Sequence, residues 1–108
     1  MNLDLETMRS AAGEACTLLK VLANPDRLLL LCQLAEGEYC VGDLAERTGI
    51  RQPTLSQQLT VLRDLNLVST RREGKLIHYS IASKQAMAVM QVLYEQFCDT
   101  KQPRGKTK

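Results

Sequence analysis

The chain has 108 residues, of which 44% are hydrophobic and 24% are charged, and this composition suits one domain with a packed core. The longest apolar run, Leu28–Cys32, is far shorter than the roughly 20 residues that a membrane-spanning helix needs. Asp4 and Glu6 stand where a secretory signal peptide would be basic. We therefore expect a cytoplasmic protein without a membrane partner.

Charge is unevenly distributed along the chain, although the net charge is only +2. Residues 1–50 carry a net charge of −4, and residues 51–108 carry +6. A basic half in a small domain is typical of nucleic-acid binding. Part of the excess lies in residues 99–108, which we expect to be a disordered basic tail after a domain of residues 1–98. Charge alone does not separate a DNA-binding surface from such a tail.

Two helices are expected at the start of the chain. Residues 3–22 carry apolar side chains at spacings of four and three, in a stripe too wide for one small domain to cover. This excess favours packing against a partner chain. Asn24 and Pro25 are a typical helix start and Gly37 is a typical end. The intervening residues 25–36 are the most apolar segment, so we expect them at the centre of the core.

The next two helices form a recognisable pair. Residues 41–48 predict a short amphipathic helix, Gly49 suits the turn after it, and residues 52–65 predict a second helix. The second helix turns four leucines inward: Leu55, Leu59, Leu62 and Leu65. Its opposite face is polar. This pattern is typical of a helix-turn-helix, although two unrelated helices can show it by chance.

A β-hairpin and a last helix complete the domain. Residues 67–72 and 75–82 flank Glu73-Gly74, and apolar residues alternate with polar ones in the second strand. A basic hairpin directly after a helix-turn-helix indicates a wing, and the alternative is a plain edge hairpin made soluble by its charges. Residues 83–97 predict the last helix. The expected fold is a mainly α winged helix-turn-helix in the order ααααββα.

Four stretches in this order resemble the ArsR family of winged-helix repressors: residues 22–28 (LANPDRL), 41–45 (VGDLA), 54–59 (TLSQQL) and 62–68 (LRDLNLV). The resemblance covers about residues 10–98. It implies a transcriptional repressor, not an enzyme, that binds double-stranded operator DNA. It also implies a homodimer held by the first and last helices, which agrees with the wide apolar stripe on residues 3–22.

The metal sites of that family are incomplete in this chain. One family site uses two cysteines, one residue apart, in the third helix. This chain has Cys40, but Gly42 occupies the position where the second cysteine would be. Another uses histidines and carboxylates on the last helix, where residues 83–97 contain no histidine and a single acid, Glu95. Since metal sites need three or four suitable ligands, we expect no metal and no cofactor. A metal-responsive repressor remains the alternative.

Cys32 and Cys98 resemble the dithiol of the sulfide- and persulfide-responsive branch of the family. The resemblance implies that reactive sulfur species join the two thiols by a disulfide or polysulfide link, that operator affinity then falls, and that sulfide-detoxification genes are controlled. Alternatives are a general thiol-redox sensor and a repressor with buried, silent thiols. A thiol enzyme is disfavoured because no histidine or glycine-rich loop accompanies a cysteine. Cys16 and Cys40 are interpreted as bystanders, with Cys40 as an alternative third thiol.

Candidate DNA contacts lie on the fourth helix and on the wing. On the helix they are Gln52, Thr54, Ser56 and Gln57, because glutamine can pair with adenine and hydroxyls can bind bases or phosphates. On the wing they are Arg71, Arg72 and Lys75, as phosphate ligands. The alternative is a solvated helix face. His78 is expected on the wing surface, not at a metal.

Overall fold

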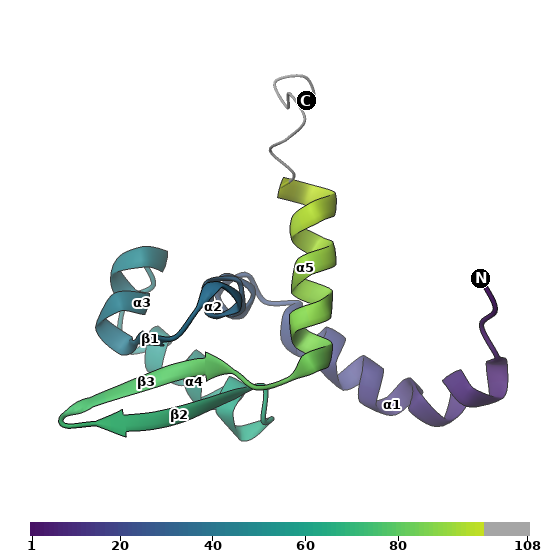
Figure 1. The fold of residues 1–108 in the computed structure, drawn as a ribbon, viewed down its shortest axis with the longest axis horizontal. Helices are drawn as coiled ribbons and strands as arrows, with labels where there is room; N and C mark the ends of the chain where they lie inside the picture. The colour runs from purple at the N-terminus through teal and green to yellow at the C-terminus, as the bar shows by residue number, and fades with distance from the viewer. Residues whose placement is uncertain (99–108) are drawn as a thin grey trace, which may run out of the picture.

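The computed structural model describes residues 1–98 as five helices and one small antiparallel sheet (Figure 1). In chain order the elements are α1 (Leu5–Leu22), α2 (Pro25–Glu36), β1 (Tyr39–Cys40), α3 (Val41–Thr48), α4 (Thr54–Asp64), β2 (Val68–Glu73), β3 (Leu76–Ile81) and α5 (Lys84–Cys98). The expected winged helix-turn-helix is confirmed, with β1 as an addition to the expected order. The tail expected at residues 99–108 lies outside the described residues.

The helix ends follow from local capping interactions. The side chain of Asp4 accepts a hydrogen bond from the backbone N–H of Thr7 at 2.9 Å and begins α1. Asn24 accepts one from the backbone N–H of Arg27 at 3.0 Å and begins α2. Gly49 ends α3 with φ of 76°, in the left-handed region that favours glycine.

The sheet has the order β1-β3-β2, and all its pairs are antiparallel. Val68 of β2 lies opposite Ile81 of β3, and the hairpin closes at Gly74 with φ of 62°. On the other side of β3, Cys40 of β1 lies opposite His78. The β2–β3 hairpin projects from the helical body as the wing (Figure 1).

The core forms where α2 meets the helix-turn-helix. Its fully buried side chains are those of Leu30, Leu31, Leu34, Leu44, Leu55, Leu59 and Leu62. The expected central position of α2 is therefore confirmed. Leu65, which was expected to point inward, is instead 42% exposed. The reason is that α4 ends at Asp64 and the chain turns toward β2 through Asn66, whose φ is 61°.

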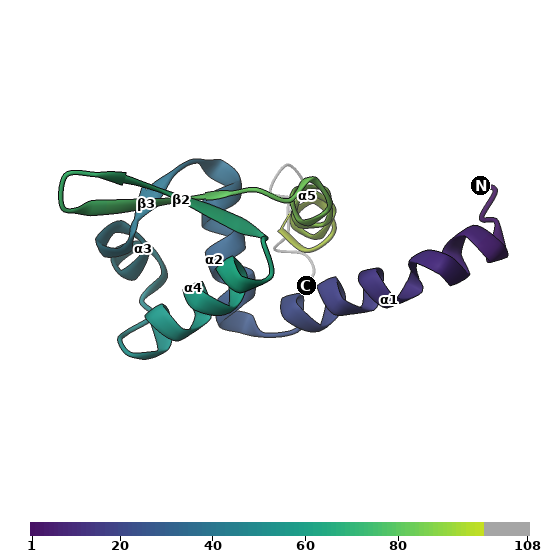
Figure 2. The ribbon, with the colours of Figure 1, turned by 90° about the horizontal axis from the view of Figure 1, so that it is seen from below.

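Two helices carry exposed apolar surface. α1 extends away from the rest of the molecule in Figure 1 and Figure 2, and only Val21 and Leu22 of this helix are buried. Exposed large apolar side chains lie on α1 (Leu5, Met8, Leu19) and on α5 (Met87, Val92, Tyr94, Phe97). None of the helices described in residues 1–98 combines the length and apolar character needed to cross a membrane.

Candidate DNA-binding interface and dithiol

Helix α4, the second helix of the helix-turn-helix, turns one face into the core and one toward solvent. Leu55, Leu59 and Leu62 are at most 1% exposed and hold the helix in place. Of the residues expected to contact DNA, Gln52, Ser56 and Gln57 are exposed and Thr54 is half-buried. Their polar groups are therefore presented together at the start of α4, as reading of a major groove by this helix requires.

Gln52 has a structural role that the sequence did not indicate. Its Oε1 atom accepts a hydrogen bond from the backbone N–H of Ser56 at 3.0 Å. This contact satisfies one of the N–H groups that every helix leaves unpaired in its first turn. Gln52 therefore helps to begin α4, in addition to its predicted contact with DNA.

Replacing Gln57 with alanine is expected to weaken operator binding by about 1–3 kcal/mol per half-site, the usual contribution of a glutamine–adenine pair. Gln57 is exposed, so the free energy of unfolding should change little. Fluorescence anisotropy with operator DNA measures the affinity. The control is Gln91→Ala, at an exposed position on α5. Equal operator affinity of the parent and the Gln57 variant would remove Gln57 from the interface.

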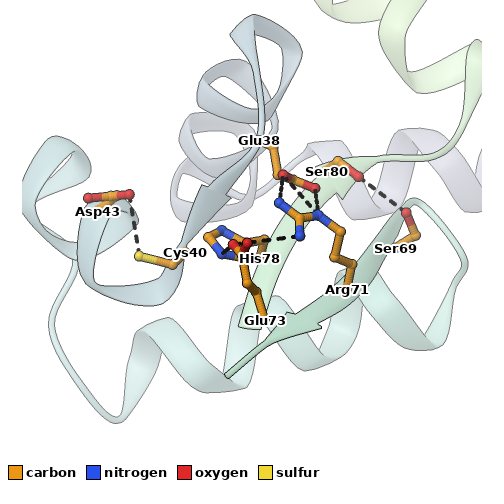
Figure 3. Close-up of polar contacts among 8 residues, drawn as sticks. All are labelled: Glu38, Cys40, Asp43, Ser69, Arg71, Glu73, His78 and Ser80. Atoms are coloured by element: carbon orange, nitrogen blue, oxygen red, sulfur yellow. Dashed lines mark hydrogen bonds and ion pairs between the residues drawn. The ribbon is translucent and has the colours of Figure 1, made fainter. Parts of the chain in front are cut away.

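The wing presents its basic residues unequally. Arg71, Arg72 and Lys75 are all exposed. The guanidinium of Arg71 is nevertheless paired within the protein (Figure 3), because its Nη2 lies 2.7 Å from Oε1 of Glu38 and its Nε lies 3.1 Å from Oε2. Its Nη1 is also 3.7 Å from a carboxylate oxygen of Glu73. The Nε and Nη2 donors of Arg71 that face Glu38 can bind a phosphate only by leaving this partner.

The electrostatics of the pair agree with its geometry. The hydrogen bond from Arg71 lowers the pKa of the Glu38 carboxyl, and the same contact raises the pKa of Arg71. Both groups are thereby held in their charged forms. Since the two side chains are solvent-exposed, we expect the pair to contribute little to the free energy of unfolding.

His78 was expected on the surface of the wing, and the structure places it elsewhere. Its side chain is 17% exposed, and its Nε2 lies 3.2 Å from a carboxylate oxygen of Glu73 (Figure 3). The physical reason is β1, which pairs with β3 and places Cys40 opposite His78. The sequence did not indicate this strand, so the face of β3 that carries His78 seemed open to solvent.

Replacing Glu38 with glutamine is expected to tighten DNA binding, because it releases Arg71 for a phosphate. One additional phosphate contact per protomer should steepen the dependence of log K on log salt by about 0.9 for each half-site. A salt titration of operator binding measures this slope. Glu46→Gln removes the same charge from the exposed face of α3 and is the control. An unchanged slope would mean that Arg71 does not contact the DNA.

The two predicted redox cysteines lie on helices that pack together. Cys32 is half-buried on α2, Cys98 is exposed at the last residue of α5, and both are free thiols. Cys32 lines a groove of about 820 Å³ between these helices. The other residues lining the groove are Ala35, Glu36, Met87, Met90, Gln91, Tyr94, Glu95 and Gln96. A small reagent can therefore reach Cys32 from the side of α5.

The surroundings of Cys32 favour its protonated form. Burial raises the pKa of this thiol, and the negative charges of Glu36 and of the Cys98 thiolate raise it further. Cys40 is engaged elsewhere, since its Sγ lies 3.3 Å from a carboxylate oxygen of Asp43 (Figure 3), and Cys16 is exposed on α1.

No cluster of three or more histidine, cysteine, aspartate or glutamate side chains in residues 1–98 is arranged to hold a metal ion.

Known proteins resemble this chain over most of its length. The family described as "Bacterial regulatory protein, arsR family" matches residues 24–70. A biofilm growth-associated repressor of Agrobacterium fabrum is 51% identical over 94 residues, which are 87% of this chain and 80% of the relative. The transcriptional activator HlyU of Vibrio cholerae is 36% identical over 100 residues, which are 93% of both chains.

Solved structures agree with the sequence relatives. The crystal structure of the transcriptional repressor BigR from Xylella fastidiosa has a TM-score of 0.85 at 47% identity, and the match covers 89% of this chain and 98% of that one. Reduced HlyU from Vibrio cholerae has a TM-score of 0.81 at 37% identity, with 87% and 99% covered. These relatives are regulators of transcription and not enzymes. The chain is a winged helix-turn-helix transcriptional repressor that belongs to the arsR family of bacterial regulatory proteins.

Proposed function

We propose that this protein is a dimeric repressor whose operator affinity is switched by oxidation of Cys32 and Cys98 by reactive sulfur species. The observation that carries the proposal is the placement of one thiol on α2 and the other at the end of α5, two helices that pack against each other. The target genes proposed are those for sulfide detoxification. One relative, HlyU of Vibrio cholerae, has a solved structure described as reduced.

The dimer is proposed from the exposed apolar faces of α1 and α5. Met8 and Leu19 on α1 are 50% and 58% exposed, and Val92 and Tyr94 on α5 are 53% and 50% exposed. Apolar stripes of this kind are typical of subunit interfaces. A relative from Mycobacterium bovis, 31% identical, is described as homodimeric. Two recognition helices would then bind half-sites about 34 Å apart on double-stranded DNA.

The reaction at the dithiol can be written with persulfide as the oxidant. The exposed thiolate of Cys98 attacks the outer sulfur of a persulfide RSSH, RS⁻ leaves, and Cys98 carries a persulfide. The thiolate of Cys32 then attacks the inner sulfur of this persulfide, which is Sγ of Cys98. An S–S bond forms between Cys32 and Cys98, and the outer sulfur leaves as HS⁻. Two thiols are oxidised and one sulfane sulfur is reduced to sulfide. If Cys32 also carries a persulfide, condensation of the two leaves a trisulfide and releases H₂S.

A covalent link between the two cysteines would join α2 to α5. α2 packs against α4, which reads the DNA, and α5 carries part of the proposed dimer surface. The link therefore biases the position of the recognition helices relative to the dimer interface. A bias between two such arrangements is the physical requirement for regulation of binding at a distance.

Mass spectrometry of the reduced protein tests this function directly. The protein is treated in parallel with glutathione persulfide, glutathione disulfide and peroxide, and the products are mapped as peptides and assayed for operator binding. We expect a Cys32–Cys98 link after persulfide alone, either as the disulfide or with one extra sulfur as the trisulfide, with loss of operator binding. Links with all three oxidants would favour a general thiol-redox sensor. If none of the three oxidants links the two cysteines, the redox proposal fails. The alternative, a metal-responsive repressor, would then be tested by equilibrium dialysis with zinc.

The raised pKa of Cys32 predicts a pH-dependent reaction. Since only the thiolate reacts, the alkylation rate of Cys32 should rise about tenfold per pH unit up to its pKa. Because the fold raises the pKa of Cys32, it favours the protonated thiol over the thiolate. The contribution of Cys32 to the free energy of unfolding is therefore present at neutral pH and is lost as the pH rises through this raised pKa. Replacing Glu36 with glutamine should speed alkylation at neutral pH, and Glu14→Gln on α1 is the control. Equal rates in both variants would contradict the assignment.

A further inference from the structure

Arg27 connects three helices through one side chain. It lies in the first turn of α2, where its Nε donates a hydrogen bond to the carbonyl oxygen of Val21 at 2.8 Å and its Nη2 lies 3.5 Å from that of Lys20. Both carbonyls belong to the last turn of α1. Its Nη1 donates to Oε1 of Gln58 on α4 at 2.8 Å. The same guanidinium therefore contacts the end of α1 and the recognition helix.

The atoms that Arg27 contacts are oxygen atoms, which favour a permanent positive charge at this position. The last carbonyls of a helix lack partners within the helix and form the negative end of its dipole. A guanidinium has donors in a rigid planar fork, so its contacts to two sides restrict both the distance and the angle between them. Lysine cannot reproduce this geometry, because it offers one ammonium group at the end of a flexible chain.

The contact with Arg27 adds a directional constraint to the apolar packing of α4. Leu55, Leu59 and Leu62 hold one stripe of the helix in the core by contacts that have no preferred direction, whereas the hydrogen bond to Gln58 has a fixed length and angle. Gln58 is half-buried and next to Gln57, the exposed residue expected to read the DNA. The hydrogen bond from Arg27 to Gln58 therefore holds α4 next to Gln57, where a small shift of the helix would displace the expected contact between Gln57 and DNA.

We propose that Arg27 is a positioning residue that sets the orientation of the recognition helix relative to α1. It does not touch the DNA and acts through Gln58. Part of the exposed apolar surface assigned to the dimer lies on α1. Because Arg27 joins the end of α1 to α4, the position of α1 in the dimer then influences the spacing between the two recognition helices. The proposal rests on the DNA-binding role of the family and on the proposed dimer, and it is independent of the thiol chemistry.

Operator specificity tests this role better than affinity alone. The variants are Arg27→Lys, Gln58→Met and the double variant, and each is measured by anisotropy with operator DNA and with DNA of unrelated sequence. We expect operator binding to weaken by about tenfold in each single variant, as for loss of a charge-assisted hydrogen bond. Binding to unrelated DNA should stay within about twofold, because it depends on phosphate contacts. The double variant should bind no more weakly than Arg27→Lys, because the contact between Arg27 and Gln58 is already lost in that single variant.

Two controls separate positioning from stability and from direct contact. Arg9→Gln removes an arginine from the exposed face of α1, where it pairs with Glu6 at 3.5 Å, and should leave the specificity ratio unchanged. Thermal unfolding and dimer mass are recorded for every variant. If Arg27→Lys does not fold, Gln58→Met carries the test alone. A specificity ratio equal to that of the parent, or additive losses in the double variant, would overturn the proposal.

Discussion

Replacing Leu59 with alanine is expected to lower the free energy of unfolding by about 2–5 kcal/mol, the range for large-to-small changes in a packed core. Leu59 is 1% exposed and lies in the middle of the apolar stripe of α4. The change removes buried apolar area and leaves a cavity between α4 and α2. Because a domain of this size has about 5–15 kcal/mol of stability, a large share would be lost.

Urea denaturation at one fixed protein concentration measures this loss, since the stability of a dimer depends on concentration. The control is Leu76→Ala, which changes the same residue type at a position 52% exposed on the wing. That variant should lose less than about 1 kcal/mol. Similar losses in the two variants would mean that Leu59 is not part of a tightly packed core.

Replacing Cys98 with serine is expected to abolish release of the operator by persulfide while leaving reduced binding unchanged. Cys98 is exposed at the end of α5, so serine should fit without disturbing the fold. Without this thiol, Cys32 cannot complete the link between α2 and α5. In the parent we expect oxidation to weaken binding about 5- to 150-fold, the usual range of coupling between two sites.

Operator binding before and after glutathione persulfide measures the effect. Cys16→Ser changes an exposed thiol on α1 and should release the operator as the parent does. The dithiol scheme would be wrong if the Cys98 variant still released the DNA after treatment. Cys32→Ser should match Cys98→Ser, because both thiols are needed for one link.

The two thiols were proposed as a pair on the strength of a family resemblance and not from their spacing. They are far apart in the chain, and the distance between them depends on how α2 packs against α5. The sequence also did not predict that Gln52 caps α4, because a glutamine before a helix has no strong local preference for capping. The exposed residues of α4 were easier to predict, since helical periodicity separates them from the buried leucines.

Interactions between neighbouring residues explain what could be read from this sequence alone. Asn24 before Pro25 predicts the start of α2, and Gly49 predicts the end of α3, because capping acts over one helical turn. The stripe of leucines on α4 predicts which face is buried. The order of helices, turn and basic hairpin then follows, and with it the winged helix-turn-helix.

Contacts between distant residues were decided only by the tertiary structure. β1 has two residues, too few for a periodic signal, and it forms because β3 offers an open edge. The pair of Arg71 with Glu38 and the bond from Arg27 to Gln58 join residues 33 and 31 positions apart. No local pattern records such partners, since their side chains meet only after the helices and the sheet have packed.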